Sequence, residues 1–134
     1  MTTHPYLHFQ GCCAEAMAAY AEILGGTDLR MLPYSAMPGG DARPGADGRI
    51  MHAELSLGSG RLMASDFPPG MEGDAQAAVS IMQAAPDVGT ASGWFDRLAE
   101  GGAVIQPFGP TFFSPGFGMV KDRFGTHWII STPA

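Results

Sequence analysis

The first part of the chain alternates β-favouring runs with a single helical run. Aromatic and branched side chains favour a strand over residues 5–10. Residues 14–24 are rich in alanine, and Met17, Tyr20 and Leu24 recur at helical spacing, which predicts a helix with one apolar face. Two glycines follow this run, as they commonly do at the end of a helix. Further strands are predicted over residues 27–34, 50–57 and 61–66.

The second part of the chain repeats this order. A strand is predicted over residues 77–83 and a helix over about 90–100, again followed by two glycines. The irregular stretch at residues 67–74 separates the two parts, which divides a single 134-residue domain into halves of about 1–70 and 75–134. Three more strands are predicted over residues 103–108, 116–121 and 126–132. Each half therefore has the order β-α-β-β-β.

Composition supports a folded chain with many turns. There are 19 glycines and 11 prolines, which favours short strands over a helical bundle. Apolar residues make up 46% and charged residues 15% of the chain, which excludes a disordered protein. Residues 35–49 contain four glycines and two prolines and almost no apolar side chain, which predicts a long loop. A loop of this length is typically either functional or mobile.

The charge of the chain bears on its partners and its location. Seven basic and 13 acidic residues give a net charge of −6, with Lys121 as the single lysine and the arginines scattered. Binding to a phosphate backbone needs clustered basic side chains, so we expect no nucleic-acid partner. The chain shows neither a signal-peptide pattern nor an apolar run long enough to cross a membrane, and we predict a cytoplasmic location with no membrane partner.

The two cysteines are adjacent, at Cys12 and Cys13. Adjacent cysteines cannot close an unstrained disulfide, so we interpret them as reduced thiols at the start of the first helix, as suits the cytoplasm. The alternative interpretation is a reactive thiol, because a helix N-terminus lowers the pKa of a cysteine.

Five runs of sequence, in order, resemble one group of proteins. They are PYLHFQG at the start, EAMAAYAEILGG, RIMHAEL, MASDFPPGM and FGMVKDRFGTHWIIS near the end. With the doubled β-α-β-β-β order they resemble the vicinal oxygen chelate superfamily of glyoxalases, bleomycin resistance proteins and extradiol dioxygenases, and most closely its PhnB-like branch. The resemblance implies an α+β fold in which two βαβββ modules form a curled mixed sheet around a cavity, with the helices on the outer face. It also implies a homodimer.

The resemblance also locates the metal-ligand positions of the metal-dependent members. In those proteins the first and fourth strands of each half supply His, Gln or Glu. Here the positions fall near Pro5 and Met63 in the first half and near Ala78 and Ile129 in the second. Proline, alanine and isoleucine carry no donor atom, and a thioether is too soft for most divalent metals. We therefore expect no metal ion and no other cofactor at these positions.

His52 and Glu54 are one residue apart on a predicted strand, so both side chains point to the same face. Two interpretations stay open. The pair forms either a displaced metal or general-base site, completed from another strand by His8 or His127, or a hydrogen-bonded pair on a partly exposed strand. His127 shares the parity of the last metal-ligand position, so we expect it to face the cavity as an acid, a base or a hydrogen-bond donor. His8, three positions after the first, is expected to face away.

Aromatic and methionine side chains gather in the predicted strands and the adjoining loops. A sheet lined with them would hold a flat apolar ligand, although the same residues also suit an ordinary core or a dimer interface. The leading hypothesis is a PhnB-like protein that binds a small apolar or aromatic molecule without the usual metal. Its candidate ligand-binding residues are His52, Glu54, Met63, Phe113, His127 and Trp128.

The alternative hypothesis is a metal-dependent lyase, isomerase or dioxygenase with the displaced site at His52 and Glu54. Some PhnB-like proteins carry a methyltransferase label, but the chain has no G-x-G-x-x-G turn for a nucleotide cofactor. It also lacks the G-x-x-x-x-G-K phosphate loop and the G-x-S-x-G nucleophile turn. The sequence assigns no catalytic residue and leaves both hypotheses in place, together with a third, a dimer that binds no ligand.

Overall fold

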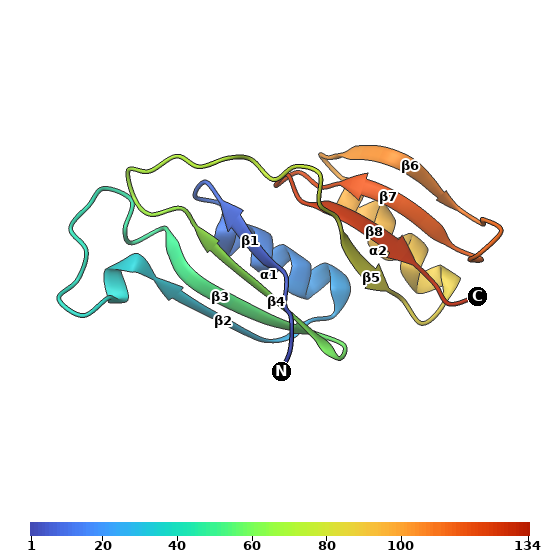
Figure 1. Cartoon of the computed structure of the whole chain (residues 1–134), viewed down its shortest axis with the longest axis horizontal. Coiled ribbons are helices and arrows are strands. Elements are labelled where there is room, and N and C mark those ends of the chain that lie inside the picture. Colours follow the sequence, from blue (N-terminus) through green and yellow to red (C-terminus); the bar gives the residue numbers. More distant parts are fainter. The chain divides into compact units, whose positions relative to one another are not determined.

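Each half of the chain forms a four-stranded β-sheet with one α-helix packed against it (Figure 1). The computed structural model describes all residues from 1 to 134 and divides them into two modules, Met1–Ala75 and Gln76–Ala134. The first module contains β1 (Tyr6–Phe9), α1 (Cys13–Leu24), β2 (Thr27–Pro33), a 3-10 turn (Tyr34–Ala36), β3 (Ile50–Leu57) and β4 (Gly60–Asp66). The second contains β5 (Ile81–Ala84), α2 (Val88–Ala99), β6 (Ala103–Gly109), β7 (Phe117–Lys121) and β8 (His127–Ser131). The predicted α+β fold with two βαβββ modules is confirmed.

The two sheets share one topology. The strand order is β1-β4-β3-β2 in the first module and β5-β8-β7-β6 in the second. The first strand of each module runs parallel to the last, whereas the other neighbouring strands are antiparallel. Each sheet is therefore mixed, and each module is closed by a pairing between strands that lie far apart in the sequence.

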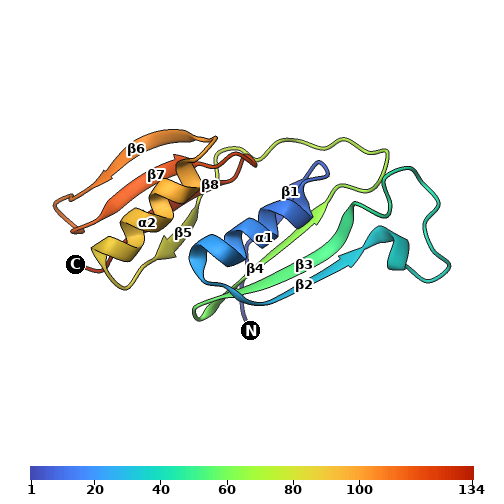
Figure 2. The same ribbon diagram turned by 180° about the vertical axis from the view of Figure 1, so that it is seen from behind.

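Helix α1 covers one face of the first sheet, and Figure 2 shows each helix in front of the sheet of its own module. The buried side chains of α1 include Met17 and Tyr20, which belong to the predicted apolar face. Leu55 and Leu57 of β3 point toward the helix, since a Cβ at Gly26, just after α1, would meet both of them. The intervening residues of β3 therefore point to the opposite face, which we call the helix-free face.

Helix α2 covers one face of the second sheet. The helix begins after Asp87, whose carboxylate accepts a hydrogen bond of 2.7 Å from the Thr90 N–H. Gly118 of β7 faces the helix, because a Cβ there would lie 2.7 Å from the Phe95 ring. Neither α1 nor α2 has the length and the apolar composition that a membrane crossing needs.

One buried carboxylate joins three parts of the first module. Asp66 ends β4 and is fully buried. Its Oδ1 accepts hydrogen bonds from the N–H groups of Gly11 and Cys13, at 2.8 and 3.0 Å, and its Oδ2 accepts one of 2.8 Å from the Ile50 N–H. Helix α1 has no side-chain cap at Cys12, so Asp66 satisfies an N–H of its first turn instead.

The starts of β1 and β5 differ from the predictions for identifiable reasons. Pro5 was placed inside the first strand, but it has no N–H to donate and contributes only its carbonyl oxygen, which accepts from the Met63 N–H. The strand therefore begins at Tyr6. The strand predicted over 77–83 begins only at Ile81, because Ala78 has a φ of 57°, which an extended strand does not adopt.

The long loop predicted over residues 35–49 is held together at its two ends. The Tyr34 N–H donates to the Arg49 carbonyl at 3.0 Å, and the Ser35 N–H donates to the Ala46 carbonyl at 3.3 Å. The Arg49 guanidinium in turn donates to the carbonyl of Phe67, after β4, at 2.9 Å. These hydrogen bonds therefore hold the end of β2 and the start of β3 together at the base of the loop.

Candidate functional site

The helix-free face of the first sheet collects polar and aromatic side chains from all four strands. The strand register pairs Tyr6 with Met63, Met63 with Glu54, and Glu54 with Arg30. Paired residues of neighbouring strands share a face of the sheet. His52 lies two positions before Glu54 on β3 and so lies on this face too.

Four side chains on this face form one polar chain. The Tyr6 hydroxyl lies 3.0 Å from His52 Nδ1, and His52 Nε2 lies 2.9 Å from Glu54 Oε1. Glu54 Oε2 is 3.4 Å from Nη1 of Arg61. The hydrogen bond from His52 is the main reason why the pKa of Glu54 lies below its ordinary value, so the carboxylate is ionised and accepts. In a neutral imidazole, donation through Nε2 leaves Nδ1 to accept from the Tyr6 hydroxyl.

This arrangement bears on the two interpretations of the His52 and Glu54 pair. The two side chains form the hydrogen-bonded pair on a partly exposed strand. The structure nowhere brings three or more His, Cys, Asp or Glu side chains together in a way that could hold a metal ion.

Flat rings lie side by side on the same face. The centroids of Tyr6 and His8 are 5.2 Å apart, and those of Tyr6 and His52 are 5.7 Å apart. The His8 ring stacks on Phe67 at 5.4 Å, with 22° between the ring planes. We call these four side chains the ring row. Because Tyr6 is 41% exposed, part of the ring row is open to a ligand.

Three members of the ring row are not among the predicted ligand-binding residues. His8 lies on the same face as His52, not on the opposite face as predicted. The error came from placing the first strand position at Pro5, because a shift of one residue reverses the direction of every side chain. The same one-residue shift explains why Tyr6 is absent from the predicted set. Phe67 lies beyond the end of β4, where strand alternation gives no guide.

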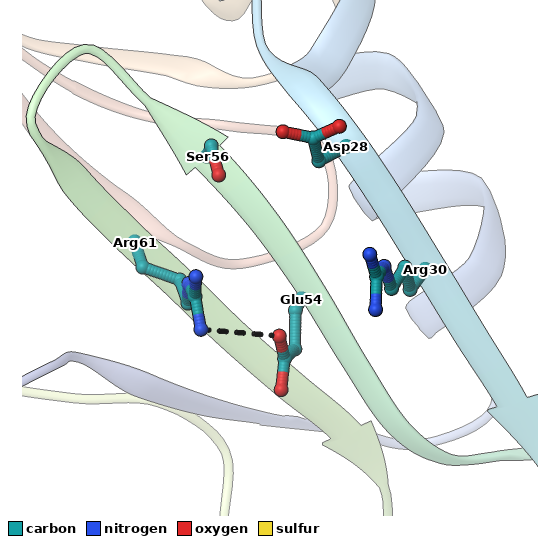
Figure 3. A pocket seen from close by; sticks show the side chains of 5 residues that line it. All are labelled: Asp28, Arg30, Glu54, Ser56 and Arg61. Atoms are coloured by element: carbon teal, nitrogen blue, oxygen red, sulfur yellow. Dashed lines mark ion pairs between the residues drawn. The ribbon is translucent and has the colours of Figure 1, made fainter.

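A polar cleft adjoins the ring row, and Figure 3 shows the side chains that surround it. The cleft has a volume of about 190 Å³ and is lined by charged side chains and one hydroxyl. A second cavity of about 260 Å³ shares two of these residues and extends to His52. The cleft residues are Asp28, Arg30, Glu54, Ser56 and Arg61.

The side chains at the four metal-ligand positions do not suit a divalent metal. Tyr6 pairs with Met63 in the first module, and Met82 pairs with Ile129 in the second. These pairs replace the estimates near Pro5 and Ala78, because both strands begin later than predicted. A phenol, two thioethers and an aliphatic side chain lack the imidazole and carboxylate donors that such a site uses.

The other three predicted ligand-binding residues lie in the second module. Phe113 is 49% exposed, and its ring packs edge-on against Phe112 and Phe117 in the loop before β7 and at its start. His127 is half-buried at the start of β8, and its buried Nδ1 atom has no hydrogen-bond partner. The structure thus brings together His52, Glu54 and Met63 but places Phe113, His127 and Trp128 in the second module.

Trp128 occupies the core of the second module. Its side chain is 0% exposed, and its indole N–H donates to Asp122 Oδ2 at 2.8 Å. It pairs with Val120, which lies on the same side of β7 as Gly118 and therefore faces α2. Trp128 and the neighbouring His127 point to opposite faces of the sheet, so they cannot contact one ligand on one face.

Cys13 is not a reactive thiol. It is the first residue of α1 and is fully buried. Burial, with a smaller contribution from the nearby Asp66 carboxylate, raises the pKa of the Cys13 thiol to about 12. Burial therefore outweighs the helix N-terminus, and the thiol stays protonated at neutral pH.

Comparison with known proteins shows that nearly the whole chain matches the model of one protein family. A family model described as 3-demethylubiquinone-9 3-methyltransferase matches residues 1–131. The protein YjdN of Escherichia coli is 30% identical over 98% of this chain and 95% of its own length. The crystal structure of PA1353 from Pseudomonas aeruginosa is 40% identical, with a TM-score of 0.90 over 99% of this chain and 98% of that one.

More distant structures share the fold alone. A putative 3-demethylubiquinone-9 3-methyltransferase, PhnB protein, from Bacillus cereus is 23% identical, with a TM-score of 0.79 over 98% of this chain and 99% of that one. A glyoxalase/bleomycin resistance protein from Albidiferax ferrireducens is 13% identical, with a TM-score of 0.65 over 100% and 99% of the two chains.

Proposed function

Because the chain belongs to the 3-demethylubiquinone-9 3-methyltransferase family, the PhnB-like branch of the vicinal oxygen chelate superfamily, we propose that it binds a small, flat aromatic molecule without a metal ion. The binding surface is the helix-free face of the first sheet. The observation that carries the proposal is the ring row, in which four flat side chains lie next to one another. A ligand ring stacked on such a row gains about 0.5–1.5 kcal/mol for each aromatic pair, beyond the burial of its apolar surface.

The predicted residues of the first module fit this surface. Met63 is the register partner of both Tyr6 and Glu54, so its side chain lies between the ring row and the polar cleft. A thioether adapts its shape to an aromatic neighbour and suits the floor of such a site. His52 and Glu54 supply hydrogen-bonding groups at the edge of the surface. Phe113 and His127, which lie in the second module, stay predictions.

The cofactors that the family names imply do not fit this chain. The metal-ligand positions lack suitable donors, as described above. A nucleotide-type methyl donor would need a strand, a glycine-rich turn and a helix leading into a neighbouring parallel strand. Here the strands before and after α1 are not neighbours in their sheet, and the same holds around α2. We therefore derive no methyl-transfer or metal-dependent step.

Calorimetric titration with matched neutral probes tests the proposal. Indole and benzyl alcohol are flat, whereas cyclohexylmethanol has a similar size but no aromatic ring. We expect the aromatic probes to bind about fivefold more tightly than cyclohexylmethanol, with no change on adding a chelator. His8→Ala removes one ring of the row and should weaken indole binding by a similar factor.

His4→Ala is the matched control, because it removes a histidine ring that lies outside the ring row. It should leave the affinity for indole unchanged. Equal affinities for aromatic and non-aromatic probes, or equal effects of the two histidine variants, would exclude the ring row as the binding surface.

We also propose that the protein is a cytoplasmic homodimer. Val104 and Ile105 on the edge strand β6, and Phe112 in the following loop, are exposed apolar side chains that a second copy could cover. The two free thiols, Cys12 and Cys13, suit a reducing compartment.

A further inference from the structure

The polar cleft beside the ring row bears on which charged groups an aromatic ligand would carry. We propose that the cleft holds a zwitterionic head group with one carboxylate and one ammonium, so that the ligand is of the aromatic amino-acid class. This inference rests on the proposed aromatic-binding function and adds the chemical class of the ligand to it.

The charges in the cleft are balanced but not all paired. Two guanidinium groups face two carboxylates, and the Ser56 hydroxyl lies among them. Arg61 forms an ion pair with Glu54 at 3.4 Å. The side chains of Arg30 and Asp28 form no hydrogen bond or ion pair, although the charge of Arg30 helps to lower the pKa of Glu54, so one positive and one negative group are available to a ligand.

The free groups point into the same space. In Figure 3 the Arg30 guanidinium and the Asp28 carboxylate extend from β2 over the sheet, and Arg61 reaches in from β4 on the other side. A ligand carboxylate between the two guanidinium groups could accept bidentate hydrogen bonds. A ligand ammonium beside Asp28 and Glu54 would meet two carboxylates.

The backbone holds Asp28 in place by an irregularity in β2. Thr27 pairs with Ser56 and Arg30 pairs with Glu54, so β2 contains one more residue than β3 over this stretch. Asp28 lies in this bulge with a φ of 54°, in the left-handed region that few residues other than glycine adopt. Bulges commonly redirect a side chain beside a binding site, and this one adds a carboxylate to the cleft.

A balanced charge set selects against simple ions. A lone anion near Arg30 is repelled by the carboxylates of Asp28 and Glu54, and a lone cation near Asp28 is repelled by the two arginines. A zwitterion satisfies both signs at once. The net charge of the four ionised side chains is zero, so the neutral zwitterion enters without excess charge.

The cleft and the ring row are close enough for one small ligand. Glu54 lines both cavities and is hydrogen-bonded to His52 of the ring row. At about 3.3 Å per residue, the distance along β3 from His52 to Glu54, which lines the cleft, is about 7 Å. An aromatic ring joined by one or two carbons to a charged head has about this length.

A series of four probes with the same phenyl ring tests the inference. They are L-phenylalanine, 3-phenylpropanoate without the amine, 2-phenylethylamine without the carboxylate, and neutral benzyl alcohol. We expect phenylalanine to bind about tenfold more tightly than either singly charged probe, as measured by calorimetric titration.

Two variants separate the two charges. Arg30→Gln should weaken phenylalanine and 3-phenylpropanoate about tenfold but should not weaken 2-phenylethylamine, because it removes a charge that repels the ammonium. Asp28→Asn should weaken phenylalanine and 2-phenylethylamine but should not weaken 3-phenylpropanoate, because it removes a charge that repels the carboxylate. Asparagine tolerates a positive φ, so this variant keeps the bulge. Arg43→Gln and Asp41→Asn remove the same charges from a pair outside the cleft and should change nothing.

Each other outcome overturns the inference. If 3-phenylpropanoate or 2-phenylethylamine binds as tightly as phenylalanine, the cleft takes a simple anion or cation. If all four probes bind equally, the head group makes no contact, and only the aromatic-binding function stands. If none binds, both proposals fail together.

Discussion

At the scale of single residues, the Cys13 thiol gives a prediction about pH. Its pKa is about 12 in the folded protein and lies near 9.0, the ordinary value of a cysteine, in the unfolded chain. Because the unfolded thiol ionises first, Cys13 contributes stability that is fully present below pH 9 and is lost as pH rises toward 12. Urea denaturation at pH 8 and pH 10.5 should show a loss of stability that is smaller in Cys13→Ala.

Thiol labelling checks the same group independently. A disulfide reagent at pH 8 should modify Cys13 only when urea unfolds the first module, since the side chain is buried. The Cys12→Ser variant assigns the signal to Cys13. Rapid labelling of this variant without urea would contradict the buried, protonated thiol.

The sequence predicted the site residues where strand alternation alone decides their direction. His52 and Glu54 were placed on one face because they are two positions apart, and they are hydrogen-bonded there. His8 was placed on the wrong face because its direction depends on where β1 begins. The free charges of Asp28 and Arg30 were not predicted, because a bulge in the register of β2 leaves no local signal in the sequence.

At the scale of elements, two glycines near α2 should respond in opposite ways to alanine. Gly93 lies inside the helix, and a Cβ there would meet nothing within 4 Å, so Gly93→Ala should stabilise the protein by about 0.5–1 kcal/mol. Gly102 lies between α2 and β6, and a Cβ there would overlap the Lys121 carbonyl oxygen of β7. Gly102→Ala should destabilise it by about 1–3 kcal/mol.

Urea denaturation measures both changes, and each variant is the control for the other. The same substitution is made at both positions, so a general effect of alanine on the unfolded chain would shift both in one direction. Stabilisation by Gly102→Ala would show that the close approach of β7 to this turn does not constrain the fold.

The order of the helices and strands could be predicted because turn-forming residues mark the boundaries between them. The glycine pairs after each helix mark where the helices end, and Gly25 adopts the left-handed conformation of a C-cap. The start of β5 could not be predicted, because the apolar residues just before Ile81 have the composition of a strand. The backbone nevertheless leaves the extended conformation at Ala78. Strand boundaries of this kind are set by pairing with β8, which lies far along the chain.

At the scale of the whole molecule, native mass spectrometry tests the proposed metal-free homodimer. Protein purified without chelator should appear at twice the chain mass of 14.0 kDa, with no bound divalent metal. The reason is the donor set at the metal-ligand positions, which offers no imidazole or carboxylate. Added zinc or manganese should also leave the melting temperature unchanged, since an ion that does not bind cannot stabilise the fold.

The His52→Ala variant separates the two hypotheses about the site. One metal ion per chain in the wild type, lost in this variant, would revive the metal-dependent alternative. A monomer at micromolar concentration would instead contradict the proposed dimer and leave the ligand-binding proposal untouched.

The sequence predicted the two modules from their repeated element order. It did not predict the pairing of β1 with β4, because that pairing joins residues as far apart in the sequence as Tyr6 and Met63.

That closing pair has a consequence for synthesis on the ribosome. β1 is made first, yet its only sheet neighbour is β4, so Leu7 and Phe9 have no strand beside them until most of the first module has emerged. Asp66, which caps α1, arrives at the same moment. The nascent module therefore closes in one late step, and its early apolar residues are what a chaperone at the tunnel exit would meet. The same delay applies to the second module, because β5 has no neighbouring strand until β8 has been synthesised.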